Sequence, residues 1–278
     1  MSLPELTLPP RLAAARARFS EVFVVVSPPR CSSTAFARVF WEQPSVRYYC
    51  HEPFEVTYYE GQGVDAVAAK LESPLDLAPL KSTQGSAEAR ALVIKEMPYQ
   101  VGDRFPMLAA LTSRPIVFLM RDPRLNIASR MARKVQVGDD PLFPQVESGW
   151  ELWQSQIEWC RDHDVPHLLV DSGDFRSQPA DIFPQVFDQL GLPFSPTMLE
   201  WQPCPEVELD NLGGKHRHLY GSVLASAGML PDTTPIPSLE HFPAEKGWRR
   251  HVEDCLAIYE WAAAAPERLL TRAASLIS

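Results

Sequence analysis

Residues 24–36, Val-Val-Val-Ser-Pro-Pro-Arg-Cys-Ser-Ser-Thr-Ala-Phe, join an apolar, β-branched stretch to a turn rich in donors. The side-chain donors are the guanidinium of Arg30 and the hydroxyls of Ser32, Ser33 and Thr34. If a helix begins at Ser33 or Thr34, the unpaired backbone N–H groups of its first turn add to them. Amides, helix dipole and guanidinium all suit phosphate or sulfate oxygens. The turn therefore predicts an anion site, and the alternative is that Ser33 or Thr34 only caps the helix.

A second cationic residue follows another apolar stretch, residues 115–120. Arg121 comes directly after this stretch, Pro123 marks a helix start, and Ser129 lies eight residues after Arg121. Because ligands of parallel α/β sheets bind at the carboxyl ends of strands, Arg121 is expected to meet whatever the first turn holds. Ser129 would face the same way two helical turns on. The alternative is an arginine in a structural salt bridge and an ordinary helical serine.

Alternating apolar and helical patterns must position these groups. The predicted buried strands are residues 22–26, 46–50, 92–94, 115–120 and 168–170. The predicted helices are residues 34–42, 105–112, 125–134, 149–160, 252–264 and 267–277. In the fourth helix Trp150 and Trp153 share one face, which indicates core packing. Strands that alternate with helices predict an α/β fold with a central, mainly parallel sheet flanked by helices.

Composition limits the classes of function. The formal net charge of −9 argues against a broad nucleic-acid surface, because that surface needs basic residues. The apolar stretches are too short to cross a bilayer, so we expect no membrane segment. The five cysteines are scattered without a CxxC pair, which indicates reduced thiols and a cytoplasmic protein. The oligomeric state cannot be read from the sequence.

The motifs resemble those of the sulfotransferase family, which uses 3′-phosphoadenosine 5′-phosphosulfate (PAPS). Residues 29–34 are similar to its strand-end pattern Pro-(Lys/Arg)-Ser-Gly-(Ser/Thr)-Thr. Arg121, Pro123 and Ser129 match its Arg-x-Pro pattern with a serine eight residues after the arginine. Residues 168–194, which end in Leu-Gly-Leu-Pro-Phe, are a weaker third match.

The resemblance implies a P-loop-like, three-layer fold over one domain, residues 1–278. It would comprise a nucleotide-binding core at 21–194 and a helical extension at 195–278 with a possible nucleotide lid. The resemblance also assigns the donor site. The residues implied to grip the 5′-phosphosulfate are Arg30, Cys31, Ser32, Ser33 and Thr34, and those implied to bind the 3′-phosphate are Arg121 and Ser129.

Two positions of the first motif depart from the family pattern. Ser32 stands where the family has glycine, and Cys31 stands where it has serine. The loop must therefore avoid a glycine-only backbone conformation or differ in geometry.

Sulfuryl transfer needs a base for the acceptor hydroxyl and cations for the charged oxygens. Glu52 follows the second strand and precedes a proline, as in family members whose glutamate is the base. We expect Glu52 to be the base, with His51 as the alternative. Lys95 ends a predicted buried strand and is expected to be a cation near the transferred group, the alternative being a surface lysine.

A late segment, residues 212–222, joins Gly-Gly to a cluster of basic residues. In composition and position it resembles the basic loop that many sulfotransferases close over the 3′-phosphate. Lys215 and Arg217 are the expected lid cations, and the alternative is a solvated basic loop. A metal site at His216 and His218 is not expected, because no nearby carboxylate or cysteine pattern completes it.

Together these features predict a sulfotransferase that moves a sulfuryl group from PAPS to a hydroxyl of a small-molecule acceptor, with no metal required. Aromatic residues in 54–63 suggest an apolar or aromatic acceptor pocket. One alternative is an ATP-dependent P-loop phosphotransferase, although GxxxxGK[ST] is absent. The other is a non-catalytic nucleotide-binding relative.

Overall fold

The computed structural model describes residues 7–82, 86, 88–209, 213 and 217–271. Within them one six-stranded sheet has the order β3-β2-β4-β1-β5-β6. The strands are Val22–Val26 (β1), Val46–His51 (β2), Leu75–Asp76 (β3), Ala91–Glu96 (β4), Ile116–Met120 (β5) and His167–Asp171 (β6). Only the β2–β3 pair is antiparallel. The mainly parallel sheet and its five predicted strands are confirmed, whereas the two-residue β3 is too short to show a periodic pattern.

The strand order decides where a ligand can bind. The chain runs from β1 to β2 on one side of the sheet and later returns to place β5 on the other side of β1. Strand β1 therefore lies between β4 and β5, with which it pairs in parallel. In open α/β sheets the crevice at such a reversal, outside the carboxyl ends of the strands, is the usual ligand site.

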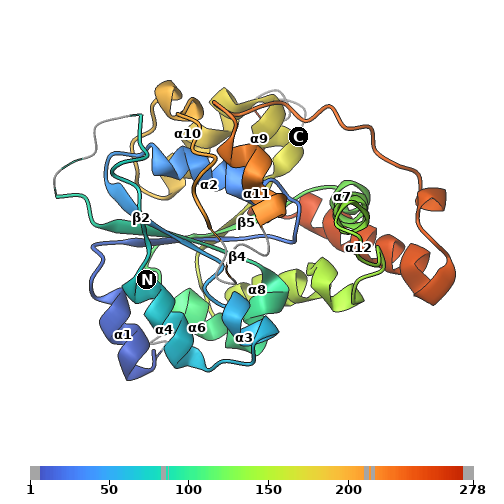
Figure 1. Ribbon diagram of the computed structural model, residues 1–278, viewed down its shortest axis with the longest axis horizontal. Coiled ribbons are helices and arrows are strands. Elements are labelled where there is room, and N and C mark those ends of the chain that lie inside the picture. Colours follow the sequence, from blue (N-terminus) through green and yellow to red (C-terminus); the bar gives the residue numbers. More distant parts are fainter. Residues whose placement is uncertain (1–6, 83–85, 87, 210–212, 214–216, 272–278) are drawn as a thin grey trace.

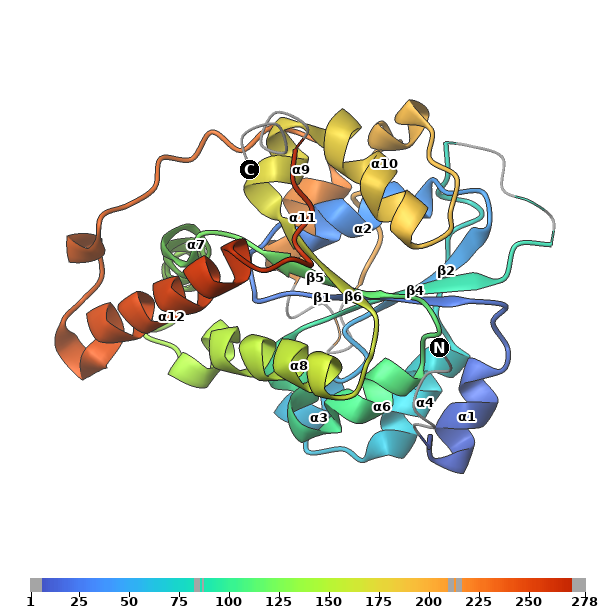
Figure 2. The same cartoon turned by 180° about the vertical axis from the view of Figure 1, so that it is seen from behind.

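Helices cover both faces of the sheet (Figure 1). One face carries α2 (Ser33–Trp41), α9 (Ser172–Ser177), α10 (Pro179–Gln189) and α11 (Arg217–Leu224). The other carries α1 (Pro10–Arg16), α3 (Glu55–Tyr59), α4 (Val64–Glu72), α5 (Pro98–Val101), α6 (Phe105–Ala110) and α8 (Trp150–Asp162). Helices α7 (Pro123–Gln136) and α12 (Trp248–Ala263) pack against each other at one end of the molecule (Figure 2). Short 3₁₀ turns lie at Gly102–Arg104, Gln145–Ser148, Pro196–Leu199, Leu239–His241 and Glu245–Gly247.

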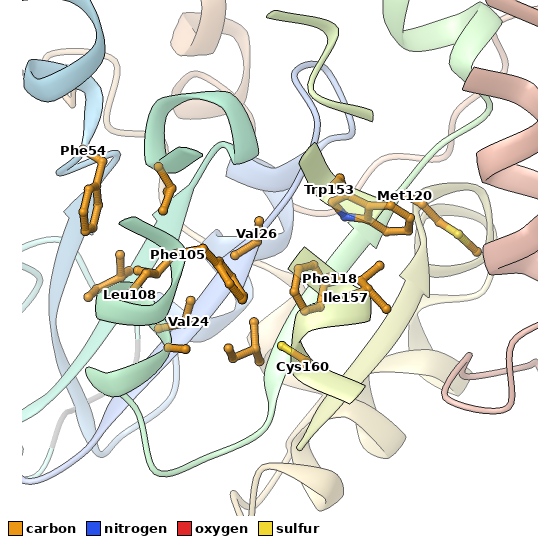
Figure 3. Packing of buried hydrophobic residues seen from close by; sticks show 14 of the residues in the cluster. Val24, Val26, Phe54, Phe105, Leu108, Phe118, Met120, Trp153, Ile157 and Cys160 are labelled. Atoms are coloured by element: carbon orange, nitrogen blue, oxygen red, sulfur yellow. The ribbon is translucent and has the colours of Figure 1, made fainter. Parts of the chain in front are cut away.

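Two hydrophobic clusters lie on opposite faces of the sheet. Successive strand side chains alternate between faces, so Val24 and Val26 join one cluster while Phe23 and Val25 join the other. Figure 3 shows the first cluster, in which side chains from β1, α6 and α8 interdigitate. Trp150 and Trp153 are fully buried, which confirms their predicted role in the core. Packing on both faces of the sheet therefore fixes the positions of the strand ends at its carboxyl edge.

The helix predicted over residues 267–277 is wrong where the structure describes it. Residues 267–271 are not helical, and Arg268 forms a parallel bridge with Leu169 of the edge strand β6. The N–H of Leu169 donates to the Glu267 carbonyl at 3.0 Å, and the N–H of Leu269 donates to the Leu169 carbonyl at 2.9 Å. The open backbone groups of a sheet edge outweigh local helix propensity here. Residues 272–277 lie outside the described residues.

None of the described helices is long and apolar enough to cross a bilayer.

Candidate active site

The carboxyl ends of β1, β2, β4, β5 and β6 open into one cavity of about 660 Å³. Each strand end contributes at least one charged side chain to its lining. These residues are Arg30 after β1, His51 and Glu52 at β2, Lys95 at β4, Arg121 after β5 and Arg176 after β6. Segments far apart in the chain therefore converge on one site.

The turn between β1 and α2 has an unusual backbone. Arg30 and Ser32 have positive φ angles of 64° and 58°, the left-handed region that glycine favours. Ser32 thus adopts this conformation without glycine, at a cost of about 1–2 kcal/mol. The N-cap position of α2 is Ser32, whose side chain makes no capping bond, so neither Ser33 nor Thr34 is the cap.

The helix that follows presents its N-terminus to the cavity. Phe36 makes the first intrahelical bond, from its N–H to the Ser32 carbonyl at 3.0 Å. The N–H groups of the three preceding residues lie in the first turn, where an α-helix offers no carbonyl partner. Ser33 and Thr34 line the cavity beside them. The first-turn amides and the Ser33 and Thr34 side chains therefore lie together at the wall of the cavity, and binding of an anion there stays a prediction.

Cys31 lies in the same turn, but its side chain is packed in the interior. Its side chain is fully buried and does not line the cavity. Asn126 donates to its Sγ from 3.4 Å, and burial raises the pKa of the thiol to about 12. Because its side chain is packed in the interior, Cys31 can contact a ligand in the cavity only through its backbone amide.

The two predicted motifs meet at Arg30. Its Nε donates to Ser129 Oγ at 3.2 Å, and Arg121 donates to the Arg30 carbonyl at 3.0 Å. A further Arg30 bond, 2.6 Å long, goes to the carbonyl of Leu219 in α11. Burial, followed by the charges of neighbouring arginines, lowers the pKa of Arg30 to about 10, so it stays charged at neutral pH.

Arg121 lies nearly buried between the two motifs. Its second terminal nitrogen donates to Asp232 Oδ2 at 2.5 Å. Its Nε is buried and has no hydrogen-bond partner among the described residues. An orphaned guanidinium N–H beside a cavity is costly unless a ligand satisfies it.

Arg176 was not predicted. It lies in α9, and its guanidinium donates to Ser32 Oγ at 3.2 Å, next to the first motif. The signal that could have found it is the same strand-end rule that singled out Arg121, because Arg176 closely follows β6.

Glu52 forms the centre of a buried polar network. One of its oxygens pairs with the Lys95 ammonium and lies 3.1 Å from His51 Nε2, while the other accepts from Gln100 Nε2 at 2.8 Å. Burial alone would raise the pKa of Glu52, but the charges of Lys95 and His51 outweigh it and hold the pKa well below 4.5. Lys95 is buried, not the surface lysine of the alternative prediction.

His51 connects the Glu52 carboxylate to residues of β2 and α11. Its Nδ1 is hydrogen-bonded to the Tyr49 hydroxyl at 2.7 Å, and its ring packs edge-on against Tyr220 of α11. With Nε2 directed at Glu52, both ring nitrogens are engaged. This arrangement orients the Glu52 carboxylate.

The predicted lid is only partly described. Lys215 and His216 lie outside the described residues. Arg217 is described: its side chain donates to the Pro205 carbonyl at 2.5 Å and does not line the cavity, so its role over the donor stays a prediction. Helix α11 instead covers the cavity with His218, Leu219 and Tyr220.

Aromatic side chains line the cavity beyond Glu52. Tyr59 and Tyr99 bond through their hydroxyls at 3.0 Å, and Met97 lies beside them in the lining. Arg130 stacks over Phe143 at 4.3 Å and is ion-paired with Glu147. Among the described residues no group of three or more His, Cys, Asp or Glu side chains could hold a metal ion.

Comparison with known proteins adds a family and a fold. A family model described as "Sulfotransferase domain" matches residues 22–243. No curated protein sequence matches the chain. The sulfotransferase domain from the curacin biosynthetic pathway superposes with a TM-score of 0.50 at 17% identity, covering 87% of this chain and 98% of that one. At 17% identity this likeness shows the fold alone.

Two further solved structures are more distant. The sulfotransferase domain of the Synechococcus PCC 7002 olefin synthase has a TM-score of 0.46 at 15% identity, covering 87% of this chain and 96% of its own. Mouse sulfotransferase SULT7A1, solved in complex with PAP, has a TM-score of 0.42 at 10% identity, covering 67% and 65%.

Proposed function

The chain belongs to the sulfotransferase family, and from that premise we propose that it moves a sulfuryl group from PAPS to a hydroxyl of a small-molecule acceptor. The observation that carries the proposal is the convergence of Arg30, Arg121 and Ser129 beside the N-terminus of α2. In this proposal residues 21–194 are the nucleotide-binding core, and 195–278 add the covering helices.

The cavity suits a donor with two separate anionic ends. The α2 N-terminus, with Arg30, Ser32, Ser33 and Thr34, would hold the 5′-phosphosulfate. Arg121 and Ser129 would hold the 3′-phosphate, and the partnerless Nε of Arg121 supports a further acceptor there. The volume of about 660 Å³ lies in the ordinary range for pockets that enclose a small molecule.

Glu52 would act as the base. The acceptor oxygen forms a bond to sulfur while the bond from sulfur to the phosphate oxygen breaks. The electron pair leaves on that phosphate oxygen and gives 3′-phosphoadenosine 5′-phosphate (PAP), while the hydroxyl proton passes to Glu52. Because its pKa is held low, Glu52 is ionised at neutral pH and would accept this proton as a weak base.

Lys95 and His51 would support this step. The Lys95 ammonium keeps Glu52 charged in a buried site and lines the same cavity, where it can stabilise negative charge on the transferred group. His51, with both ring nitrogens engaged, would orient the carboxylate and not act as the base itself. The Tyr59, Tyr99 and Met97 side of the cavity favours an apolar or aromatic acceptor.

Calorimetry with PAP and with ADP tests the donor. We expect binding of PAP and much weaker binding of ADP, because ADP lacks the 3′-phosphate. In Arg121→Ala the affinity for PAP should fall about tenfold or more, as for loss of a hydrogen bond to a charged group. Arg250→Ala is the matched control, because Arg250 pairs with Asp254 on the exposed face of α12 and does not line the cavity. Equal affinity for ADP would favour the ATP-dependent phosphotransferase.

A transfer assay tests the chemistry. Purified protein with ³⁵S-labelled PAPS and a panel of phenols and aliphatic alcohols should give labelled products. Binding of PAP without transfer to any acceptor would favour a non-catalytic nucleotide-binding relative.

A further inference from the structure

An acidic residue lies against the donor-site arginines. Asp232 Oδ2 accepts from Arg121 at 2.5 Å and lies 3.7 Å from an Arg176 terminal nitrogen. Its side chain is only 12% exposed. Burial would raise the pKa of Asp232, but hydrogen bonds from Thr234 and the two arginines outweigh it and lower the pKa, so the carboxylate is charged.

Asp232 belongs to a segment without regular secondary structure, residues 229–238. Arg176 holds this segment through its backbone, donating to the carbonyls of Leu230 at 2.8 Å and Pro231 at 3.2 Å. Leu230 and Ile236, on either side of Asp232, are more than half exposed. Met229 packs against the core, but the apolar side chains nearest to Asp232 do little to anchor it, so movement of Asp232 mainly costs its contacts with the two arginines.

Arg176 connects this segment to the first motif. The same terminal nitrogen that faces Asp232 donates to Ser32 Oγ, in the turn proposed to grip the donor. Arg121 likewise faces both Asp232 and the carbonyl of Arg30. Two cationic side chains from different strand ends thus converge on a single carboxylate.

A carboxylate is an incomplete partner for these groups. It carries one negative charge against two guanidinium groups, and it leaves the Arg121 Nε unsatisfied. A phosphate or sulfate group carries three terminal oxygens and, as a phosphate monoester, nearly two charges. It could therefore satisfy more of the N–H groups in this place.

We propose that Arg121 and Arg176 form one anion subsite for the donor, and that the Asp232 carboxylate competes with the donor for it. The proposal rests on the proposed function and adds two residues to it. Arg176 becomes a donor-binding residue. Asp232 becomes an internal competitor that lowers donor affinity and that must leave the two arginines when the donor binds.

Titration calorimetry with PAP tests this. Asp232→Asn keeps the size of the side chain and removes its charge, and we expect PAP to bind about tenfold more tightly. Arg176→Gln should bind PAP about tenfold more weakly. Asp254→Asn is the matched control, because Asp254 pairs with Arg250 on the exposed face of α12 and does not line the cavity.

Hydrogen exchange of the unmodified protein gives a readout that needs no variant. On addition of PAP, amides in residues 229–234 should exchange faster while those at the start of α2 exchange more slowly. One outcome contradicts the subsite alone: PAP binds, both Asp232→Asn and Arg176→Gln bind it as tightly as the unmodified protein does, and PAP leaves amide exchange in residues 229–234 unchanged. The subsite is then wrong and the proposed function stands. If the unmodified protein does not bind PAP at all, the proposed function fails and the subsite falls with it.

Discussion

The buried pair of Lys95 and Glu52 makes the sharpest prediction about the site. Its side chains are 2% and 6% exposed, so neither charge can be compensated by water if its partner is removed. We consider Glu52→Gln, Lys95→Met and the double variant, which together form a thermodynamic cycle.

Each single substitution breaks the ion pair and leaves one of its two charges buried, although the Glu52 carboxylate keeps His51 and Gln100 when Lys95 is replaced. Breaking a buried ion pair in this way costs about 3–5 kcal/mol of unfolding free energy. The double variant removes both charges and keeps similar volumes, and replacements of that kind are often close to neutral. We therefore expect the double variant to be more stable than either single variant, with a coupling of about 2–3 kcal/mol.

Across these variants kcat should not change in parallel with the free energy of unfolding. General-base catalysis contributes about 10²–10⁴-fold, and the depressed pKa makes Glu52 a weak base, so Glu52→Gln should lose about 10²-fold in kcat. The double variant should regain stability but remain as slow, because the base is still missing. Binding of PAP should change little in Glu52→Gln.

Urea unfolding and steady-state transfer assays measure these quantities. The exposed pair of Arg250 and Asp254 supplies a control cycle, Arg250→Met with Asp254→Asn, in which little coupling is expected. Near-normal turnover in Glu52→Gln would refute the assignment of the base. A double variant as unstable as the sum of its singles would refute the reasoning about the ion pair.

Three further predictions concern pH, packing and thiol chemistry. The pKa of Glu52 is lower in the folded protein than in the unfolded chain, so the ionised carboxylate contributes to folding stability above its ordinary pKa. This stability is lost only as the pH falls through the lower, folded pKa. The pH–rate profile should accordingly show no loss of activity from protonation of Glu52 above about pH 5. Trp153→Ala should lower the free energy of unfolding by about 3–5 kcal/mol in urea titrations, because the indole is fully buried beside Phe118. Cys31 and Cys255 should resist iodoacetamide at pH 8 in the folded protein and react after denaturation, because burial raises the pKa of each to about 12; labelling of either thiol in the native protein, read by mass spectrometry, would contradict this.

Local patterns in the sequence were enough for the architecture. Five strands and their parallel arrangement follow from β-branched apolar runs that alternate with amphipathic helices, because periodicity reports burial directly. The two donor motifs are also local, since Arg30 and Arg121 each follow a strand that the sequence already shows. Their meeting at one edge follows from the parallel sheet, in which all carboxyl ends share a side.

The partners of the charged groups were decided by tertiary structure. Lys95 and Glu52 are 43 residues apart, and they meet because β2 and β4 are neighbours in the sheet. Arg121 and Asp232 are 111 residues apart, and no periodicity connects a loop aspartate to a strand end. Likewise the Arg217 bond to the Pro205 carbonyl and the pairing of residues 267–269 with β6 depend on which segments lie side by side in the fold. A short-range pattern encodes which face of an element is buried, whereas the choice among distant polar partners exists only once the chain has folded.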